Sequence, residues 1–312
     1  SSKIKIFSQA EILDLLQYSI KLGSFNDYNN NFNKYLKRLA TSILEFQKKE
    51  ALPKEIIESI KTLILEYKNE TISSAFYKII GITFNNDDFG KMIEAFQKEY
   101  NNKEMLFKDI FIDIYILGKN SKPEKKDFIV IEKKLKALPK ELTMELFNKA
   151  LNTILEIKIE ATKQYSTFYL VDETNETFLR GLLYLVPSLK EQVLYQKIYQ
   201  LCQKCFSKLS GIGFVSEKLG NACINSLNLA KDIYCVSLLS RLKYSIKHTK
   251  ANKNISEILK KEAKRLNIRE EEIEDMSVQD FGLKNGKLTF DFPNNQAVIK
   301  VLAFNKVELL WF

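Results

Sequence analysis

Apolar residues recur along most of this chain at the spacing of one helix face. Near the start, Ile12, Leu16 and Ile20 follow one another at intervals of four residues, which places them on one side of an α-helix. Ser8 and Glu11 stand three residues apart just before this run, the pattern of a helix-opening capping box. We therefore predict a helix over residues 12–22.

The same apolar spacing recurs along the chain as far as about residue 275. Proline and glycine residues lie at the ends of these apolar runs. Pro53, Pro123 and Pro139 precede apolar runs, where a proline fits the first turn of a helix, and Gly118 follows one, where glycine ends a helix. The pattern predicts further helices over residues 32–46, 56–64, 72–80, 89–100, 103–117, 128–135, 142–159, 177–186, 190–209, 216–227, 232–246, 255–266 and 270–275.

Short connections between so many helices, with no alternating strands, define the expected fold class. We predict a mainly all-α fold, an α-solenoid of HEAT-like antiparallel helix pairs. Only three segments near the end are predicted to be strands, with turn sequences such as Asn285-Gly286 beside them. These segments are residues 287–292, 297–302 and 307–312. We expect three parts: an N-terminal helical array over 1–170, a basic C-terminal array over 171–282, and a short three-stranded β-meander over 283–312. Because the last residues are apolar, we expect the meander to continue into a longer chain.

Composition restricts the class of protein. Hydrophobic residues make up 45% and charged residues 28% of the 312 residues, as in folded globular proteins. No apolar run approaches the roughly 18 residues of a membrane span, and the first residues do not resemble a signal peptide. Four cysteines are too few for a disulfide framework. We expect a cytoplasmic protein.

Positive charge is concentrated in one quarter of the chain. The formal net charge is +9, and residues 190–265 hold 15 Lys or Arg against five Asp or Glu. Such clustering can follow a phosphate backbone, although a solvated helix face or attraction to an acidic protein would give the same pattern. The candidate contacts to phosphate or to a partner are Arg241, Lys243, Lys247, Lys250 and Lys253.

Gly211-Ile212-Gly213 adds a second candidate for anion binding, because glycine loops before a helix can cradle a phosphate. The motif lacks a preceding strand and a third glycine. A tight turn between helices is the competing interpretation.

Three further motifs suggest chemistry but have plainer explanations. The spacing of the four cysteines does not match two zinc-binding pairs. We therefore interpret them as core residues: Cys202, Cys205, Cys223 and Cys235. Asp280-Phe281-Gly282 matches a kinase magnesium motif without the other kinase motifs. His248, the only histidine, lies in a polar connection, and we expect it to be a solvated loop residue. We predict no catalytic residue, metal or cofactor.

From about residue 178 to the end, the chain resembles a bacterial family, domain of unknown function 4132, which includes proteins similar to a molybdate-metabolism regulator. The matching blocks are Leu179-Arg180-Gly181-Leu182, Gly211-Ile212-Gly213, Lys218-Leu219-Gly220-Asn221-Ala222, Leu239-Ser240-Arg241-Leu242-Lys243, 258–266, Asp280-Phe281-Gly282-Leu283 and Val307-Glu308-Leu309-Leu310-Trp311. The resemblance implies a HEAT-like region followed by another domain, and an association with complexes that contain MoxR-type ATPases. It implies no settled activity.

These observations favour a non-enzymatic interaction module or scaffold of a larger bacterial protein. We expect it to bind a protein partner or another domain of its own chain, because stacked helices provide extended surfaces. Non-specific binding of nucleic acid through the basic region is the alternative. An enzyme of unknown class is a more remote one.

Overall fold

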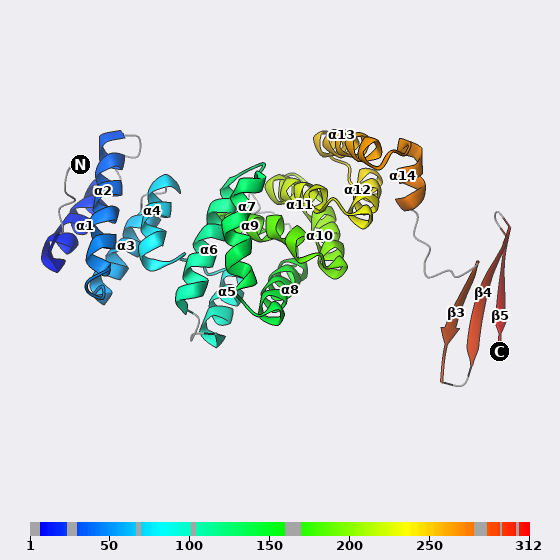
Figure 1. Cartoon of the computed structure of the whole chain (residues 1–312), viewed down its shortest axis with the longest axis horizontal. Coiled ribbons are helices and arrows are strands. Elements are labelled where there is room, and N and C mark those ends of the chain that lie inside the picture. The colour runs from blue at the N-terminus through cyan, green and yellow to red at the C-terminus, as the bar shows by residue number, and fades with distance from the viewer. Residues whose placement is uncertain are drawn as a thin grey trace.

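The computed structural model describes residues 7–23, 30–66, 70–100, 104–159, 170–277, 286–293, 295–303 and 306–312. Most of these residues are helical, and the helices follow one another along the long axis of the molecule (Figure 1). The helices are α1 (Gln9–Gly23), α2 (Asn30–Gln47), α3 (Lys54–Glu66), α4 (Glu70–Ile80), α5 (Asp88–Glu99), α6 (Glu104–Lys119), α7 (Lys125–Lys136), α8 (Lys140–Glu156), α9 (Glu173–Leu189), α10 (Gln192–Cys205), α11 (Glu217–Ala230), α12 (Ile233–Ser245), α13 (Thr249–Leu266) and α14 (Glu270–Ser277).

Five strands form two separate antiparallel sheets in the described part of the chain. A small hairpin joins α10 to α11 and pairs β1 (Lys208–Leu209) with β2 (Gly213–Phe214). The C-terminal sheet has the order β3 (Lys287–Asp291), β4 (Gln296–Ala303) and β5 (Lys306–Trp311). These elements confirm the mainly α-helical class with a small C-terminal three-stranded element.

Helices two places apart in the sequence pack together repeatedly. Such pairs include α1 with α3, α2 with α4, α8 with α10, α9 with α11, and α10 with α12. This arrangement is typical of helical arrays, in which each unit contacts mainly its neighbours. Among the described residues, no helix is both long and apolar enough to cross a membrane.

Buried side chains form two clusters. The first includes residues from Ile12 to Ile79 and lies within α1–α4, and the second includes residues from Tyr77 to Ile273. The rings of Tyr77 on α4 and Tyr115 on α6, which both belong to the second cluster, meet edge to face at 5.3 Å. The predicted boundary between 170 and 171 remains a prediction, and the second core is continuous across it.

Two glycines bring α6 and α9 into backbone contact. A methyl group at Gly118 would overlap the carbonyl oxygen of Thr177, and one at Gly181 would overlap that of Ile114. Gly118 is the next-to-last residue of α6, so the predicted helix end is correct to within one residue, and the same glycine permits this close crossing. The capping box of Ser8 and Glu11 is confirmed, since the Ser8 backbone N–H donates to Glu11 Oε2 at 2.8 Å.

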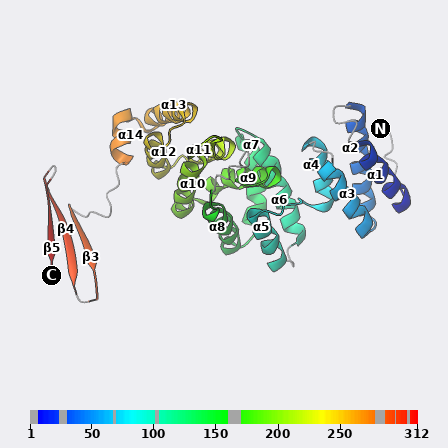
Figure 2. The same cartoon turned by 180° about the vertical axis from the view of Figure 1, so that it is seen from behind.

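The C-terminal sheet stands apart from the helices in two opposite views (Figures 1 and 2). Large side chains on this sheet are mostly exposed, whereas large side chains of the helices are mostly buried. Only Ala297 and Val298 are buried among the described residues of the sheet.

Candidate functional site: the lysine face of helix α13

Helix α13 has one apolar side and one lysine-rich side. Ile255, Leu259 and Ala263 recur every four residues and are buried. Because a helix turns by about 100° per residue, the side opposite these residues faces solvent. This amphipathic pattern leaves the lysines of α13 exposed to solvent.

Five exposed lysines lie on that outer side, within a sector of about 100° of the helix circumference, and we call them the lysine face. They are Lys250, Lys253, Lys260, Lys261 and Lys264. With a rise of 1.5 Å per residue, the row extends for about 21 Å. The exposed carboxylate Glu257 is the one acidic residue in the same sector. Within the described chain, none of the five lysines forms an ion pair with a carboxylate.

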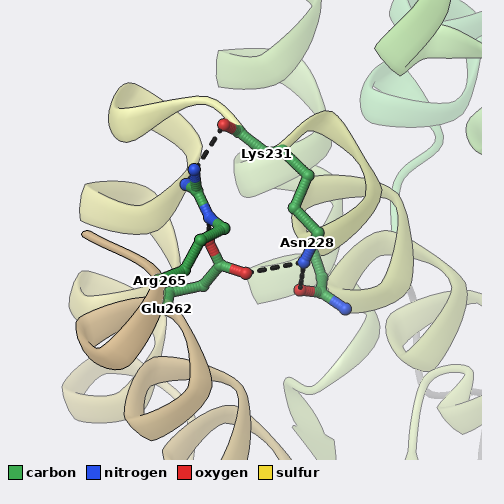
Figure 3. Close-up of polar contacts among 4 residues, drawn as sticks. All are labelled: Asn228, Lys231, Glu262 and Arg265. Carbon is green, nitrogen blue, oxygen red and sulfur yellow. Dashed lines mark hydrogen bonds and ion pairs between the residues drawn. The ribbon is translucent and has the colours of Figure 1, made fainter. Parts of the chain in front are cut away.

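Other basic residues of this region already have anionic partners. Glu262 on α13 is buried, with 2% of its surface exposed, and it holds two cations (Figure 3). Lys231 Nζ lies 2.6 Å from Glu262 Oε1, and Arg265 Nε lies 2.5 Å from Glu262 Oε2. Lys231 Nζ also donates to Asn228 Oδ1 at 3.1 Å. This network joins the end of α11 to α13, so part of the positive charge has a structural role.

The electrostatics of Glu262 follow from these contacts. Burial alone would raise the pKa of this carboxyl, but hydrogen bonds from Lys231 and Arg265 more than offset burial and lower the pKa below its usual value of 4.5. Glu262 is therefore ionised at neutral pH and retains both cations.

Lys204 has a structural role as well. Its ammonium donates to the carbonyl oxygens of Ile154, Leu155 and Ile157 at 2.9, 2.8 and 2.5 Å. These carbonyls lie at the end of α8, where a cation satisfies unpaired acceptors and interacts favourably with the helix dipole. Burial lowers the pKa of Lys204. This lysine fixes α10 against α8 and is not part of the exposed charge.

The candidate residues chosen from the sequence fall on three neighbouring segments. Arg241 and Lys243 are half-buried on α12, and Lys243 Nζ lies 5.5 Å from the centre of the Tyr244 ring. Lys247 is exposed on the connection to α13. Lys250 and Lys253 belong to the lysine face. The structure thus places Lys247, Lys250 and Lys253 together around the start of one helix.

Gly211 and Gly213 shape the hairpin between β1 and β2. Their φ angles are +77° and +120°, in a region that glycine adopts at little cost. The next helix, α11, begins at a different residue, because Ser216 Oγ accepts from the backbone N–H of Leu219 at 3.2 Å. The expected alternative of a tight turn fits this geometry, and the glycines do not lie at the helix N-terminus that a phosphate cradle requires.

His248 is buried, so the prediction of a solvated loop residue is wrong. Its Nδ1 accepts from the backbone N–H of Ala251 at 3.0 Å and caps α13. Its Nε2 lies 3.2 Å from a carboxylate oxygen of Glu217. The imidazole also packs between Phe206 and Phe214, with ring centres 5.0 and 4.6 Å away. His248 thereby seats the hairpin against the beginning of the lysine-bearing helix.

The four cysteines are buried and unpaired, which confirms their interpretation as core residues. Burial raises the pKa of the Cys205, Cys223 and Cys235 thiols. Such thiols stay protonated at neutral pH and are poor nucleophiles. No group of three or more His, Cys, Asp or Glu side chains in the described part of the chain is arranged to hold a metal ion. Asp280-Phe281-Gly282 lies outside the described residues.

Sequence reasoning named only two of the five lysines of the lysine face. The charge count of residues 190–265 includes Lys260, Lys261 and Lys264, but the predicted contacts do not. Helical periodicity could have found them, because they recur at intervals that match the sector of Lys250 and Lys253. The apolar positions of the same helix give the complementary signal.

Comparisons with protein-family models, curated proteins and solved structures found no match to this chain. The resemblance of its C-terminal part to domain of unknown function 4132 remains an expectation from the sequence.

Proposed function

We propose that this chain is a helical interaction module that binds an acidic protein partner through the lysine face of α13. The observation that carries the proposal is the row of five exposed lysines with no carboxylate partner among the described residues. Unpaired charges of one sign attract a complementary surface and raise association rates. The buried network of Glu262 holds the helix in place without using these lysines.

We propose a HEAT-like array, which the packing of helices two places apart supports. We also propose that it acts in the cytoplasm as a non-enzymatic scaffold, with its own further domain or an ATPase-containing complex as alternative partners. Reduced cysteines fit that compartment.

Nucleic acid is the second candidate partner. The extended shape of the lysine face favours it, since a row of about 21 Å can follow several phosphates. Lysines bind phosphates as point charges, whereas base recognition relies largely on bidentate side chains such as arginine. We therefore expect any such binding to be independent of nucleotide sequence.

A titration with three labelled probes tests both candidates. The probes are a poly-glutamate chain, a generic DNA duplex and a generic single strand, each at roughly 50 and 200 mM salt. The test variant is Lys253→Glu/Lys260→Glu/Lys264→Glu. The matched control is Lys98→Glu/Lys133→Glu/Lys136→Glu, which reverses three exposed lysines of α5 and α7 and changes the net charge equally.

If the lysine face binds acidic proteins, poly-glutamate should bind the parent chain and the control but not the test variant. If the lysine face binds nucleic acid, the duplex or the single strand should bind preferentially. In that case the slope of log affinity against log salt should fall by about 2 to 3 in the test variant. Equal weakening by both triple variants would show that net charge, and not the lysine face, causes binding. Absence of binding to all probes at low salt would contradict the proposal.

A further inference from the structure

The two ring nitrogens of His248 take opposite roles in hydrogen bonding. Nδ1 accepts from the backbone N–H of Ala251 at 3.0 Å, so Nδ1 itself carries no proton. A neutral imidazole then has its proton on Nε2. Nε2 lies 3.2 Å from a carboxylate oxygen of Glu217, which is close enough to donate to it. The contacts therefore assign the neutral ring with its proton on Nε2.

A second proton on the ring would affect these two contacts differently. It would turn Nδ1 into a donor, and a donor cannot cap the N–H of Ala251. The contact from Nε2 to the carboxylate of Glu217 would persist and would become charge-assisted. Protonation would therefore release the start of α13 while the ring stays attached to α11.

The release has a structural consequence because the cap is buried. His248 is 7% and Ala251 is 1% exposed, and a buried N–H without an acceptor is costly. The first turn of α13 must therefore open for the N–H of Ala251 to reach water. In that turn, the backbone N–H groups have no partner within the helix and depend on the cap.

The elements packed around the ring contribute one charged group. Phe206 and Phe214 lie against the imidazole from the end of α10 and from β2, with ring centres 5.0 and 4.6 Å away. Glu217 of α11 is the charged residue that pairs with it in the described part of the chain. Lys247 and Lys250 flank His248 in the sequence and are exposed. Glu217 therefore provides the electrostatic attraction that holds a protonated ring on α11.

We propose that His248 is a proton-operated latch at the start of α13. The neutral ring closes the first turn of the helix, and the protonated ring opens it. Histidine is the side chain that ordinarily changes its charge between pH 5 and 8, so we expect α13 to open at its start as pH falls through this range. The latch concerns the order of the helix and does not require a partner.

The latch also connects to the lysine face, because Lys250 and Lys253 lie at the start of α13. This consequence rests on the proposed function. The affinity for poly-glutamate, measured relative to the His248→Asn variant at the same pH, should fall between pH 8 and pH 5.5. If poly-glutamate binds neither protein, the proposed function fails, whereas the latch is still tested by the amide of Ala251.

Nuclear magnetic resonance of the full chain tests the latch directly. His248 is the only histidine, so the ring nitrogen signals report its protonation without overlap. Exchange of the Ala251 amide, corrected for the intrinsic effect of pH, reports the cap. We expect protection of this amide to fall about fivefold between pH 8 and pH 5.5, as for the loss of one helix cap. The amide of Leu219 is the internal control, because its cap is the Ser216 hydroxyl, which does not titrate in this range.

Two variants separate the roles of the two nitrogens. His248→Asn keeps a capping side chain that does not titrate, so protection of Ala251 should be the same at both pH values. Glu217→Gln removes the charge that holds the protonated ring on α11. At pH 5.5 the ring of this variant should leave Phe206 and Phe214, and its proton signals should lose the shifts that these rings cause.

Three results would overturn the inference. Protection of Ala251 that persists while the ring signals show a protonated His248 would mean that the cap does not depend on the neutral ring. A ring that stays neutral down to pH 5.5 would mean that the latch remains closed throughout this range. An equal loss of protection in His248→Asn would place the pH-sensitive group elsewhere.

Discussion

The helices and the C-terminal sheet use apolar residues in opposite ways. In the helices, Ile255 and Leu259 face other parts of the same chain and are buried. In the sheet, Leu309 and Trp311 have the same chemical character but are more than half exposed. The comparison shows that an apolar stripe in a sequence predicts a covered surface but does not say which molecule covers it.

The difference has an energetic consequence. Removal of apolar surface from water stabilises a fold by roughly 25 cal/mol per Å². The helices obtain this stabilisation within one chain, through two continuous buried clusters. The three strands of the C-terminal sheet bury few side chains, so they obtain much less of this stabilisation. Variants can test each side of this contrast.

The largest effect is expected where α6 crosses α9. Gly181→Ala should lower the free energy of unfolding by about 3 kcal/mol, because the added methyl group would overlap a carbonyl of α6. In an ordinary helix the same change stabilises the protein by about 1 kcal/mol. The sign of the change in the free energy of unfolding therefore distinguishes a close crossing from an ordinary helix position. Urea unfolding followed by circular dichroism provides the measurement.

Gly211→Ala is the control for this prediction. A methyl group there meets no atom within 4 Å, although φ is +77°. The expected cost is about 1 kcal/mol, from backbone conformation alone. Stabilisation by Gly181→Ala would show that the crossing is looser than described.

The buried carboxylate of Glu262 should have the next largest effect. Glu262→Gln keeps the shape but removes the charge that holds Lys231 and Arg265, and should cost about 2 kcal/mol at pH 7. Both cations are partly exposed, 50% and 41%, so water recovers some of the loss. Glu257→Gln, at an exposed position on the same helix, should change stability by at most about 0.5 kcal/mol.

The pH dependence of this variant has a definite sign. Because folding lowers the pKa of Glu262, its ionised form stabilises the native state above the unfolded pKa of about 4.5. That stabilisation is lost as pH falls through the folded pKa. The stability difference between the parent chain and Glu262→Gln should therefore shrink below about pH 4.5. A difference that is constant from pH 7 to pH 3 would contradict this account.

The cap of α13 should give a smaller effect. His248→Ala removes the acceptor for the Ala251 N–H and should cost about 1 kcal/mol through the cap. His248→Asn loses the same ring contacts with Phe206 and Phe214 but keeps a good capping side chain. His248→Asn should thus be the more stable variant in thermal unfolding. Equal stabilities would mean that ring packing, not the cap, is the contribution of His248.

The smallest effect on stability is expected at the lysine face. Lys253→Glu/Lys260→Glu/Lys264→Glu should change the free energy of unfolding by at most about 1 kcal/mol, since these side chains are exposed and lack ion pairs in the described chain. The same variant should abolish binding of the partner. A larger loss of stability would indicate that the lysines support the fold.

Local sequence patterns predict the helices and strands. Features that depend on contacts between distant residues could not be predicted from the sequence. The apolar spacing that starts at Ile12 places α1 nearly where the structure has it, because period alone decides which residues share a helix face. The approach of Gly118 to Gly181 involves two helices, α6 and α9, that are separated in the sequence by two others. No local pattern distinguishes such a glycine from one that only ends a helix.

The residues of the candidate site also fall into two groups, those that a local pattern predicts and those whose contacts come from distant segments. The lysine face follows from the period of α13, and the sequence could have supplied all five residues. The burial of His248 could not be predicted locally, because its cover comes from Phe214 on a hairpin that precedes it by more than 30 residues. The partners of Lys231 and Arg265 are likewise set by the packing of α11 on α13.

The central claim is that burial within the chain stabilises the helices far more than the C-terminal sheet. Hydrogen–deuterium exchange of the full chain tests it most directly, because the protection of an amide reports the free energy of local opening. We predict that amides of α9 and α11 exchange much more slowly than those of β4. Protection of β4 equal to that of the two helices would contradict the claim.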